Sequence, residues 1–185
     1  MTTALLLIDI QNDYFPDGRR ELVGAQAAGA RAKDLLVAFR EIGWPVIHVR
    51  HVANEVGATF FLPDTDGAEI HELVTPMSGE VVITKHTPNA FLGTDLRAEL
   101  DELGVRVVVV AGMMTHMCVD STTRAASDLG FVCSVAGDAC ATYDQWYEDR
   151  KIDARDVHAA FLSALADAFA TVESTADLVN GFTLD

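Results

Sequence analysis

The fold is decided by residues 107–126, which read Val-Val-Val-Val-Ala-Gly-Met-Met-Thr-His-Met-Cys-Val-Asp-Ser-Thr-Thr-Arg-Ala-Ala. Residues 105–111 are apolar at nearly every position, which is typical of a strand buried on both faces of a parallel sheet. A helix is predicted to begin near Cys118, because Asp120 and Arg124 lie one helical turn apart and small or apolar side chains occupy another face. Cys118 is therefore expected at the sheet edge where open α/β sheets bind ligands.

Two interpretations of Cys118 follow from this position. Buried cysteines are common as small core residues, and a cysteine at a helix start can be one of them. The alternative is a nucleophile, because the free amides and the dipole of a first helical turn favour a thiolate. Residues elsewhere in the chain are needed to distinguish the two interpretations.

Composition limits the class of protein. With 185 residues, half of them hydrophobic, residues 1–185 are expected to form one globular domain. A net charge of −15 disfavours nucleic acid and anionic membranes as partners. The three cysteines form no C-x-x-C pair, which argues against a disulfide scaffold and favours the reducing cytoplasm. The apolar run at 4–8 ends at Asp9 and is too short for a signal peptide or a spanning helix.

Strand and helix patterns alternate along the chain. Strands are predicted at 4–10, 46–52, 81–84, 105–111 and 131–136, and helices at 28–42, 96–103, from about 118 to 129, and 157–169. This order predicts a three-layer α/β/α, doubly wound fold with a mostly parallel sheet. Residues 137–142 are expected to form a turn, and the long connection at 54–79 is of a length that often acts as a lid.

Asp9, Lys85 and Cys118 each stand at the end of a different predicted strand. A carboxylate there can be a turn residue and a lysine can be solvated, but Lys85 is one of only three lysines and directly continues a buried strand. In a parallel sheet the three side chains would meet in one crevice. Asp9 could then serve as general base, Lys85 could keep Asp9 ionised and favour the thiolate, and Cys118 could attack a carbonyl without any metal.

Four motifs carry a resemblance to a known family. They are Leu-Leu-Ile-Asp-Ile-Gln-Asn-Asp-Tyr-Phe at 6–15, Val-Ile-Thr-Lys-His at 82–86, Ala-Phe-Leu-Gly-Thr at 90–94, and Gly-Met-Met-Thr-His-Met-Cys-Val-Asp-Ser-Thr-Thr-Arg-Ala-Ala at 112–126. Together they resemble the isochorismatase-like cysteine hydrolases over nearly the whole chain. The resemblance implies about six strands in a Rossmann-like sheet and a homo-oligomer, a dimer or larger.

The resemblance also implies roles for particular residues. Asp9, Lys85 and Cys118 match the family's catalytic triad. The cis peptide that precedes the nucleophile in the family maps to Met113-Met114, and the amides of Met114 and Cys118 would form the oxyanion hole.

Departures from the family pattern limit the reactions that the chain is expected to catalyse. The zinc-dependent nicotinamidases hold their metal with histidines after the second strand, whereas His48 and His51 are three residues apart on a predicted strand and point to opposite faces. No metal and no cofactor are therefore expected. Asn89 stands where relatives often have serine, and nothing in the sequence explains that change.

The sequence thus predicts a cysteine hydrolase that cleaves a C–N bond of a small amide, ureido or cyclic amide compound through a thioester. Two alternatives stay open: an isochorismatase-type enol ether hydrolase, which needs no thiol, and a catalytically silent interaction protein on the same scaffold. The intact triad weighs against the silent protein. The side chains expected to line the substrate pocket are Phe15, Phe60, Phe91, His116, Tyr143 and Trp146.

Overall fold

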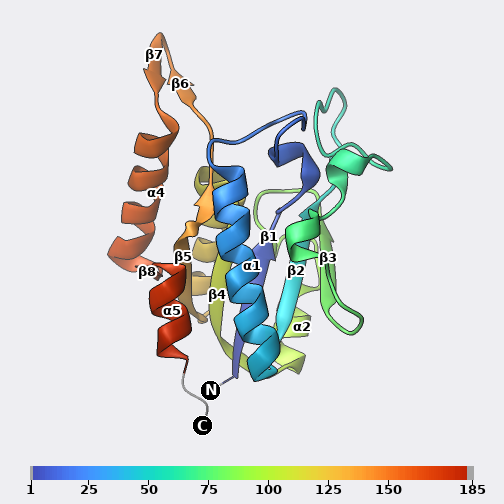
Figure 1. Ribbon diagram of the computed structural model, residues 1–185, viewed down its shortest axis with the longest axis vertical. Coiled ribbons are helices and arrows are strands. Elements are labelled where there is room, and N and C mark those ends of the chain that lie inside the picture. Colours follow the sequence, from blue (N-terminus) through green and yellow to red (C-terminus); the bar gives the residue numbers. More distant parts are fainter. Residues whose placement is uncertain (1, 183–185) are drawn as a thin grey trace.

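The central sheet consists of six parallel strands in the order β3-β2-β1-β4-β5-β8 (Figure 1). A computed structural model describes residues 2–182. The strands are β1 (Thr2–Ile8), β2 (Val46–His51), β3 (Val81–Lys85), β4 (Val105–Met113), β5 (Val132–Ala141) and β8 (Thr171–Glu173). The predicted doubly wound, Rossmann-like parallel sheet is confirmed.

Helices cover both faces of the sheet and bury two separate apolar cores. One core lies beneath α1 (Ala25–Ile42) and α5 (Thr175–Gly181). The other lies beneath α2 (Leu96–Glu102), α3 (Asp120–Asp128) and α4 (Ala154–Ala168). The three-layer α/β/α arrangement follows, because each helix buries one apolar stripe against a sheet that is apolar on both faces.

Two elements differ from the sequence prediction. Strand β5 continues through residues 137–141, which were expected to form a turn, because Cys140 and Ala141 pair with the end of β4 after a shift in register. Strand β8 has only three residues at the sheet edge, which is too short for an alternation pattern to mark it. Beyond these, β6 (Gln145–Tyr147) and β7 (Arg150–Ile152) form a hairpin that projects from the body of the molecule (Figure 1).

Gly112 lets β4 lie against the end of β1. Its φ angle is +138°, and a Cβ atom there would overlap the carbonyl oxygen of Ile8, its partner across the two strands. Only glycine adopts this conformation without strain and leaves that space free. The close approach brings the residue after β1, Asp9, towards the turn that follows β4.

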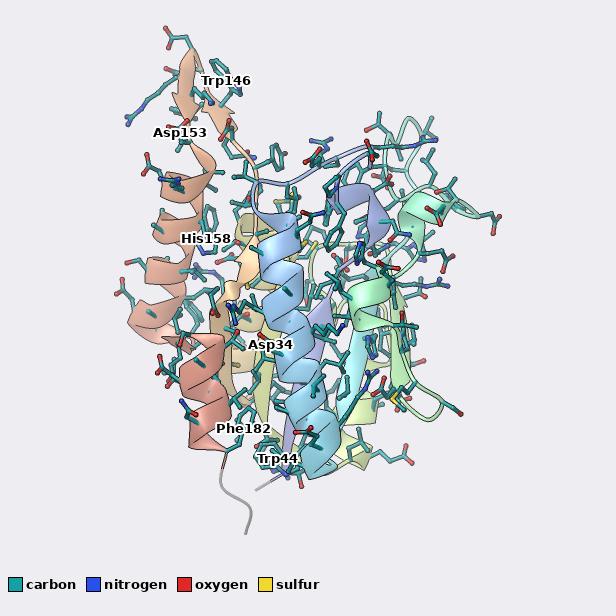
Figure 2. The ribbon with its side chains drawn as sticks, in the orientation of Figure 1. Asp34, Trp44, Trp146, Asp153, His158 and Phe182 are labelled. Atoms are coloured by element: carbon teal, nitrogen blue, oxygen red, sulfur yellow. The ribbon has the colours of Figure 1, made fainter. Side chains whose placement is uncertain are left out.

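At the end of the sheet opposite to Asp9, aromatic side chains pack against one another. Phe182 packs edge-on against Phe39 of α1 and against Trp44, with ring centroids 5.0 and 5.2 Å away (Figure 2). This contact holds α5 to α1 and leaves the carboxyl ends of the strands free to build a site. Within residues 2–182, no helix is both long and apolar enough to cross a membrane.

A partly buried ion pair between Arg40 and Glu80 fixes the loop before β3. The Arg40 guanidinium donates to both carboxylate oxygens of Glu80 at 2.7 and 2.8 Å, and His48 Nε2 lies 2.9 Å from Glu80 Oε2. Burial raises the pKa of Glu80, but the hydrogen bonds from Arg40, the Met77 amide and His48 outweigh burial and lower this pKa from 4.5 to about 2.

Replacing Glu80 by glutamine is therefore expected to lower the free energy of unfolding by about 3 kcal/mol at neutral pH. Because the folded-state pKa is depressed, this stabilisation is fully present above the unfolded-state pKa and disappears as the pH falls from 4.5 to about 2. Urea unfolding of both proteins at several pH values measures it. Asp34→Asn, which breaks the exposed pair with Arg31, is the matched control and should cost less than about 1 kcal/mol. Equal losses in the two variants would contradict the argument.

Candidate active site

The candidate site lies at the carboxyl ends of four adjacent strands. Asp9 follows β1, His51 is the last residue of β2, Lys85 is the last residue of β3, and Cys118 lies in the turn after β4. These ends share the upper edge of the sheet in Figure 1. Strands β1 and β4 also form the switch point of the doubly wound sheet, where the strand order reverses and where such folds bind ligands.

The Lys85 ammonium group joins these residues into one cluster, called here the buried cluster: Asp9, His51, Lys85 and Cys118. Its Nζ atom lies 2.7 Å from Asp9 Oδ2, 3.3 Å from Cys118 Sγ and 3.1 Å from His51 Nδ1. Lys85 and Asp9 are fully buried, and Cys118 is 5% exposed. The structure therefore brings the three predicted catalytic side chains together in a space largely closed to water.

Asp9 adopts a strained backbone conformation. Its φ angle is +50°, which residues with a Cβ atom rarely adopt, and its amide donates to the carbonyl of Val49 at 2.9 Å. Although Oδ2 forms the ion pair with Lys85, neither carboxylate oxygen has a well-aligned hydrogen bond from within residues 2–182. A buried carboxylate with unused acceptor capacity is suited to receive a proton from a neighbouring group.

The Cys118 thiol differs from the sequence expectation. The helix start and Lys85 were expected to lower its pKa, but burial, the largest influence, and Asp9 raise the pKa of Cys118 well above its ordinary value, while Lys85 offsets only part of this effect. Cys118 therefore keeps its proton at neutral pH. A protonated nucleophile needs an adjacent base, and Asp9 is placed to be that base.

Lys85 is charged and His51 is neutral. Burial lowers the pKa of Lys85, but the interactions with Asp9 and Cys118 outweigh burial, so this pKa is raised and the ammonium stays charged. Burial and then the Lys85 charge lower the pKa of His51, which keeps the ring neutral and lets Nδ1 accept a hydrogen bond from Lys85. The sequence analysis missed His51, although it ends β2 and is paired with Lys85 across the two strands.

Cys118 is held in a π-helical turn, Thr115–Val119, that precedes α3. The Met114 carbonyl accepts the amide hydrogens of Met117 and Val119, which closes the turn, and the peptide bond between Met113 and Met114 is cis. Single π-helical turns occur frequently at functional sites. This turn, and not a regular α-helix, sets the direction of the Cys118 side chain.

Three of the six expected pocket side chains are linked to the buried cluster by ring contacts or by position in the same turn. The His116 ring lies 5.6 Å from the Tyr143 ring on one side. On the other side, Phe60 contacts Phe61, whose ring lies 5.9 Å from that of His51. Phe60, His116 and Tyr143 are each partly buried.

The other three expected pocket residues contact different parts of the protein. Phe15 stacks on His71 with ring centroids 3.6 Å apart, and Phe91 stacks on Phe131 at 6.1 Å. Trp146 is 66% exposed on the projecting hairpin (Figure 2). An aromatic residue in a loop can turn to either side of the backbone, so the sequence alone did not fix these directions.

The buried cluster contains three side chains that can act as metal ligands. Ligand atoms of Asp9, His51 and Cys118 lie within 4.8 Å of one another, a spacing that could hold an ion. The Lys85 ammonium, however, is within hydrogen-bond or ion-pair distance of all three. The three side chains therefore already surround one cation, the Lys85 ammonium, and its charge would repel a metal ion. His48 does not join them, because its ring contacts Glu80 on the other face of β2.

A cysteine, a lysine and a carboxylate are buried together at the switch point of a doubly wound sheet, an arrangement suited to a hydrolase with a thiol nucleophile. The sequence model described as "Isochorismatase domain" matches residues 3–177. The chain belongs to the isochorismatase family of hydrolases.

Individual relatives agree with this assignment. The chain is 51% identical to an uncharacterized isochorismatase family protein, YddQ of Bacillus subtilis, over 95% of this chain and 97% of that protein. It is 33% identical to Nicotinamidase 3 of Arabidopsis thaliana over 90% of this chain and 82% of that protein. The crystal structure of a putative isochorismatase hydrolase from Oleispira antarctica superimposes with a TM-score of 0.94 at 50% identity, over 97% of each chain.

Proposed function

We propose that the protein is a cysteine amidohydrolase that cleaves a C–N bond of a small amide, ureido or cyclic amide compound through a thioester. One observation carries the proposal: the Cys118 sulfur lies 3.3 Å from an ammonium that itself lies 2.7 Å from a buried carboxylate. A nucleophile, a base and a fixed charge are thereby combined in one low-dielectric site. The relative named as a nicotinamidase supports cleavage of an amide.

The acylation half of the reaction begins with Asp9. Its carboxylate takes the thiol proton as the Cys118 sulfur attacks the substrate carbonyl carbon. The amides of Met114 and Cys118 stabilise the resulting oxyanion, and each such donor is worth about 3 kcal/mol in other enzymes. Asp9 then returns the proton to the substrate nitrogen, the C–N bond breaks, and ammonia or an amine leaves the thioester.

Deacylation reverses these roles with water as the nucleophile. Asp9 removes a proton from water as its oxygen attacks the thioester carbon, and the S–C bond breaks. The proton then passes to the Cys118 sulfur, which regenerates the thiol. Throughout, Lys85 stabilises the negative charge that alternates between the carboxylate and the sulfur, and neutral His51 holds the ammonium in place.

Ammonia release from a panel of small amides and ureas tests this function. A substrate should show Cys118-dependent release, and mass spectrometry of the stopped reaction should show an acyl adduct on Cys118. The enol ether alternative predicts turnover without ammonia and without an adduct. The silent-scaffold alternative predicts no turnover at all.

Metal chelation should leave the rate unchanged. The Lys85 ammonium occupies the position that a cation would need between Asp9 and Cys118, so EDTA or dipicolinate should remove nothing that the reaction uses. The measurement is the initial rate before and after chelation, with metal content determined on the same sample. Loss of activity that added zinc or manganese restores would refute a metal-free mechanism.

We also propose a homo-oligomer. The family resemblance implies one, and apolar side chains at 60, 61 and 143–147 are candidates for its interface. Phe61 is buried and Phe60 is partly buried, whereas Trp146 and Tyr147 are 66% and 69% exposed on the β6–β7 hairpin. Exposed aromatic side chains on a projecting element are suited to an interface.

Sedimentation at micromolar concentration should accordingly show a dimer or a larger species. Replacing both Trp146 and Tyr147 by serine should shift the population towards the 20.0 kDa monomer. The control is Val56→Ser, which replaces an even more exposed apolar residue in a loop away from the hairpin. A native protein that sediments only as the monomer would rule out the oligomer.

The remaining proposals concern organisation and location. We propose that residues 1–185 form a single isochorismatase-like hydrolase domain, which the family match over 3–177 supports. All three cysteines are free thiols, which supports the reducing cytoplasm as the location. The net charge of −15 still argues for a small-molecule substrate and against nucleic acid or membrane partners.

A further inference from the structure

Arg20 is a partly buried cation without a carboxylate partner. Six of the 13 Lys and Arg side chains are at least partly buried, and all six lie within residues 2–182. Five of the six form ion pairs, namely Arg40–Glu80, Arg50–Glu69, Lys85–Asp9, Arg97–Asp101 and Arg124–Asp120. In the described part of the chain Arg20 forms none, although the protein carries 28 acidic residues. Charged side chains are rarely buried without a partner, so a partly buried arginine that has no carboxylate partner is available to bind a ligand.

Two aromatic rings hold the Arg20 guanidinium in place. Its central carbon lies 4.8 Å from the centroid of Phe60 and 5.3 Å from that of Tyr143, and it donates a hydrogen bond to the Tyr143 hydroxyl at 3.3 Å. The Arg20 amide donates to the carbonyl of Asp13 at 2.8 Å, which fixes the backbone beneath. Of the five guanidinium N–H groups, only this one has an acceptor within residues 2–182, so a planar donor edge is left free.

Ring contacts connect the held guanidinium to the buried cluster. Tyr143 contacts the ring of His116, two residues before Cys118 in the same turn. Phe60 contacts the ring of Tyr14, whose pKa is raised first by burial and then by Cys118 and Asp9, and is lowered by Arg20. Tyr14 also contacts Phe61, whose ring lies 5.9 Å from that of His51 in the buried cluster. A small molecule that reaches Cys118 along these rings would meet the guanidinium with its far end.

We propose that Arg20 binds a carboxylate of the substrate, so that the enzyme acts on small amide or ureido compounds that carry a carboxylate. This inference rests on the proposed hydrolase function. A free, planar pair of N–H donors matches the two oxygens of a carboxylate, and the aromatic rings limit water and hold the fork in one orientation. Binding the far carboxylate would place the scissile carbonyl at Cys118.

The competing explanation is that Arg20 only ties three loops together by stacking. The two explanations differ in what a neutral replacement does to selectivity. Loss of a structural clamp lowers the affinity for charged and neutral compounds alike, whereas loss of a carboxylate partner removes only the preference for the charged compound.

Matched compounds test this difference. The probes are oxamate, malonamate, succinamate and ureidoacetate, each compared with the uncharged compound in which an amide replaces the carboxylate. Binding is measured by equilibrium titration of the Cys118→Ala protein, which cannot turn the probes over, and ammonia release is measured with native Cys118. In at least one pair, the carboxylate compound should bind roughly 10- to 100-fold more tightly than its amide.

Arg20→Gln should abolish that preference, and Arg20→Lys should restore part of it, since an ammonium keeps the charge but not the planar fork. Arg19→Gln is the matched control, because it removes the same charge from the adjacent, exposed residue. Circular dichroism and thermal unfolding verify that each variant is folded. The inference is overturned if no pair shows a preference, or if Arg20→Gln and Arg19→Gln change the preference equally. If ammonia is released but the carboxylate compounds are not preferred, the hydrolase function stands and the role of Arg20 is rejected. If binding depends on Arg20 but no probe is turned over, the role of Arg20 stands and the hydrolase function is rejected.

Discussion

Replacing Cys118 by alanine is expected to lower turnover by roughly 10⁴-fold or more, because no other group in the buried cluster can form the thioester. The fold should persist. The side chain is small and 5% exposed, and its loss should cost about 1 kcal/mol, the scale of removing one buried group of this size. Initial rates of ammonia release, together with urea unfolding, separate the two effects.

The control is Cys133→Ala, which removes an equally buried thiol from β5 and should leave the rate unchanged. The Cys118→Ala protein should still bind substrate, and its mass spectrum should lack the acyl adduct of the native enzyme. If this variant instead keeps a near-native rate on the natural substrate, the thioester mechanism is wrong. The acid-catalysed ether cleavage, which needs Asp9 but not the thiol, would then be the better account.

Replacing Asp9 by asparagine should have two large effects. Turnover should fall by roughly 10²- to 10⁴-fold, because an amide cannot accept the thiol proton that Cys118 retains. Stability should also fall by about 3–5 kcal/mol, because the fully buried Lys85 ammonium loses the carboxylate 2.7 Å away. Ammonia release and urea unfolding measure the two effects on the same preparation.

A double variant separates chemistry from stability. Adding Lys85→Met to Asp9→Asn removes the unpaired buried charge and keeps an apolar chain of similar length, so most of the lost stability should return. Turnover should not return, since the base is still absent. An active double variant would show that Asp9 acts only by neutralising Lys85 and would exclude it as the general base.

Much of the fold and the core of the site could be predicted from local sequence. The mostly apolar runs at 4–10, 81–84 and 105–111 mark strands because each is short and nearly uninterrupted. In a parallel α/β sheet all strands end at one edge, so the residues that follow them must gather there. That rule alone placed Asp9 and Cys118 beside Lys85, and the family motifs agreed with it.

Other features of the site depended on the tertiary structure, because they arise from contacts between residues that are distant in sequence. The raised pKa of Cys118 results from burial and from Asp9 together, and neither cause can be recognised in the sequence of the turn that carries the thiol. The interaction of His51 with Lys85 depends on the pairing of β2 with β3.

The sequence by itself determined the parallel sheet and the three reactive residues at its edge, because strand periodicity and chain order are local properties. Only the tertiary structure decided which loop side chains face those residues. Phe60 and Tyr143 enclose Arg20, while Phe91 stacks on Phe131 and Trp146 points into solvent. A loop side chain is directed by long-range contacts and not by a repeating pattern, so its partners exist only once the chain has folded.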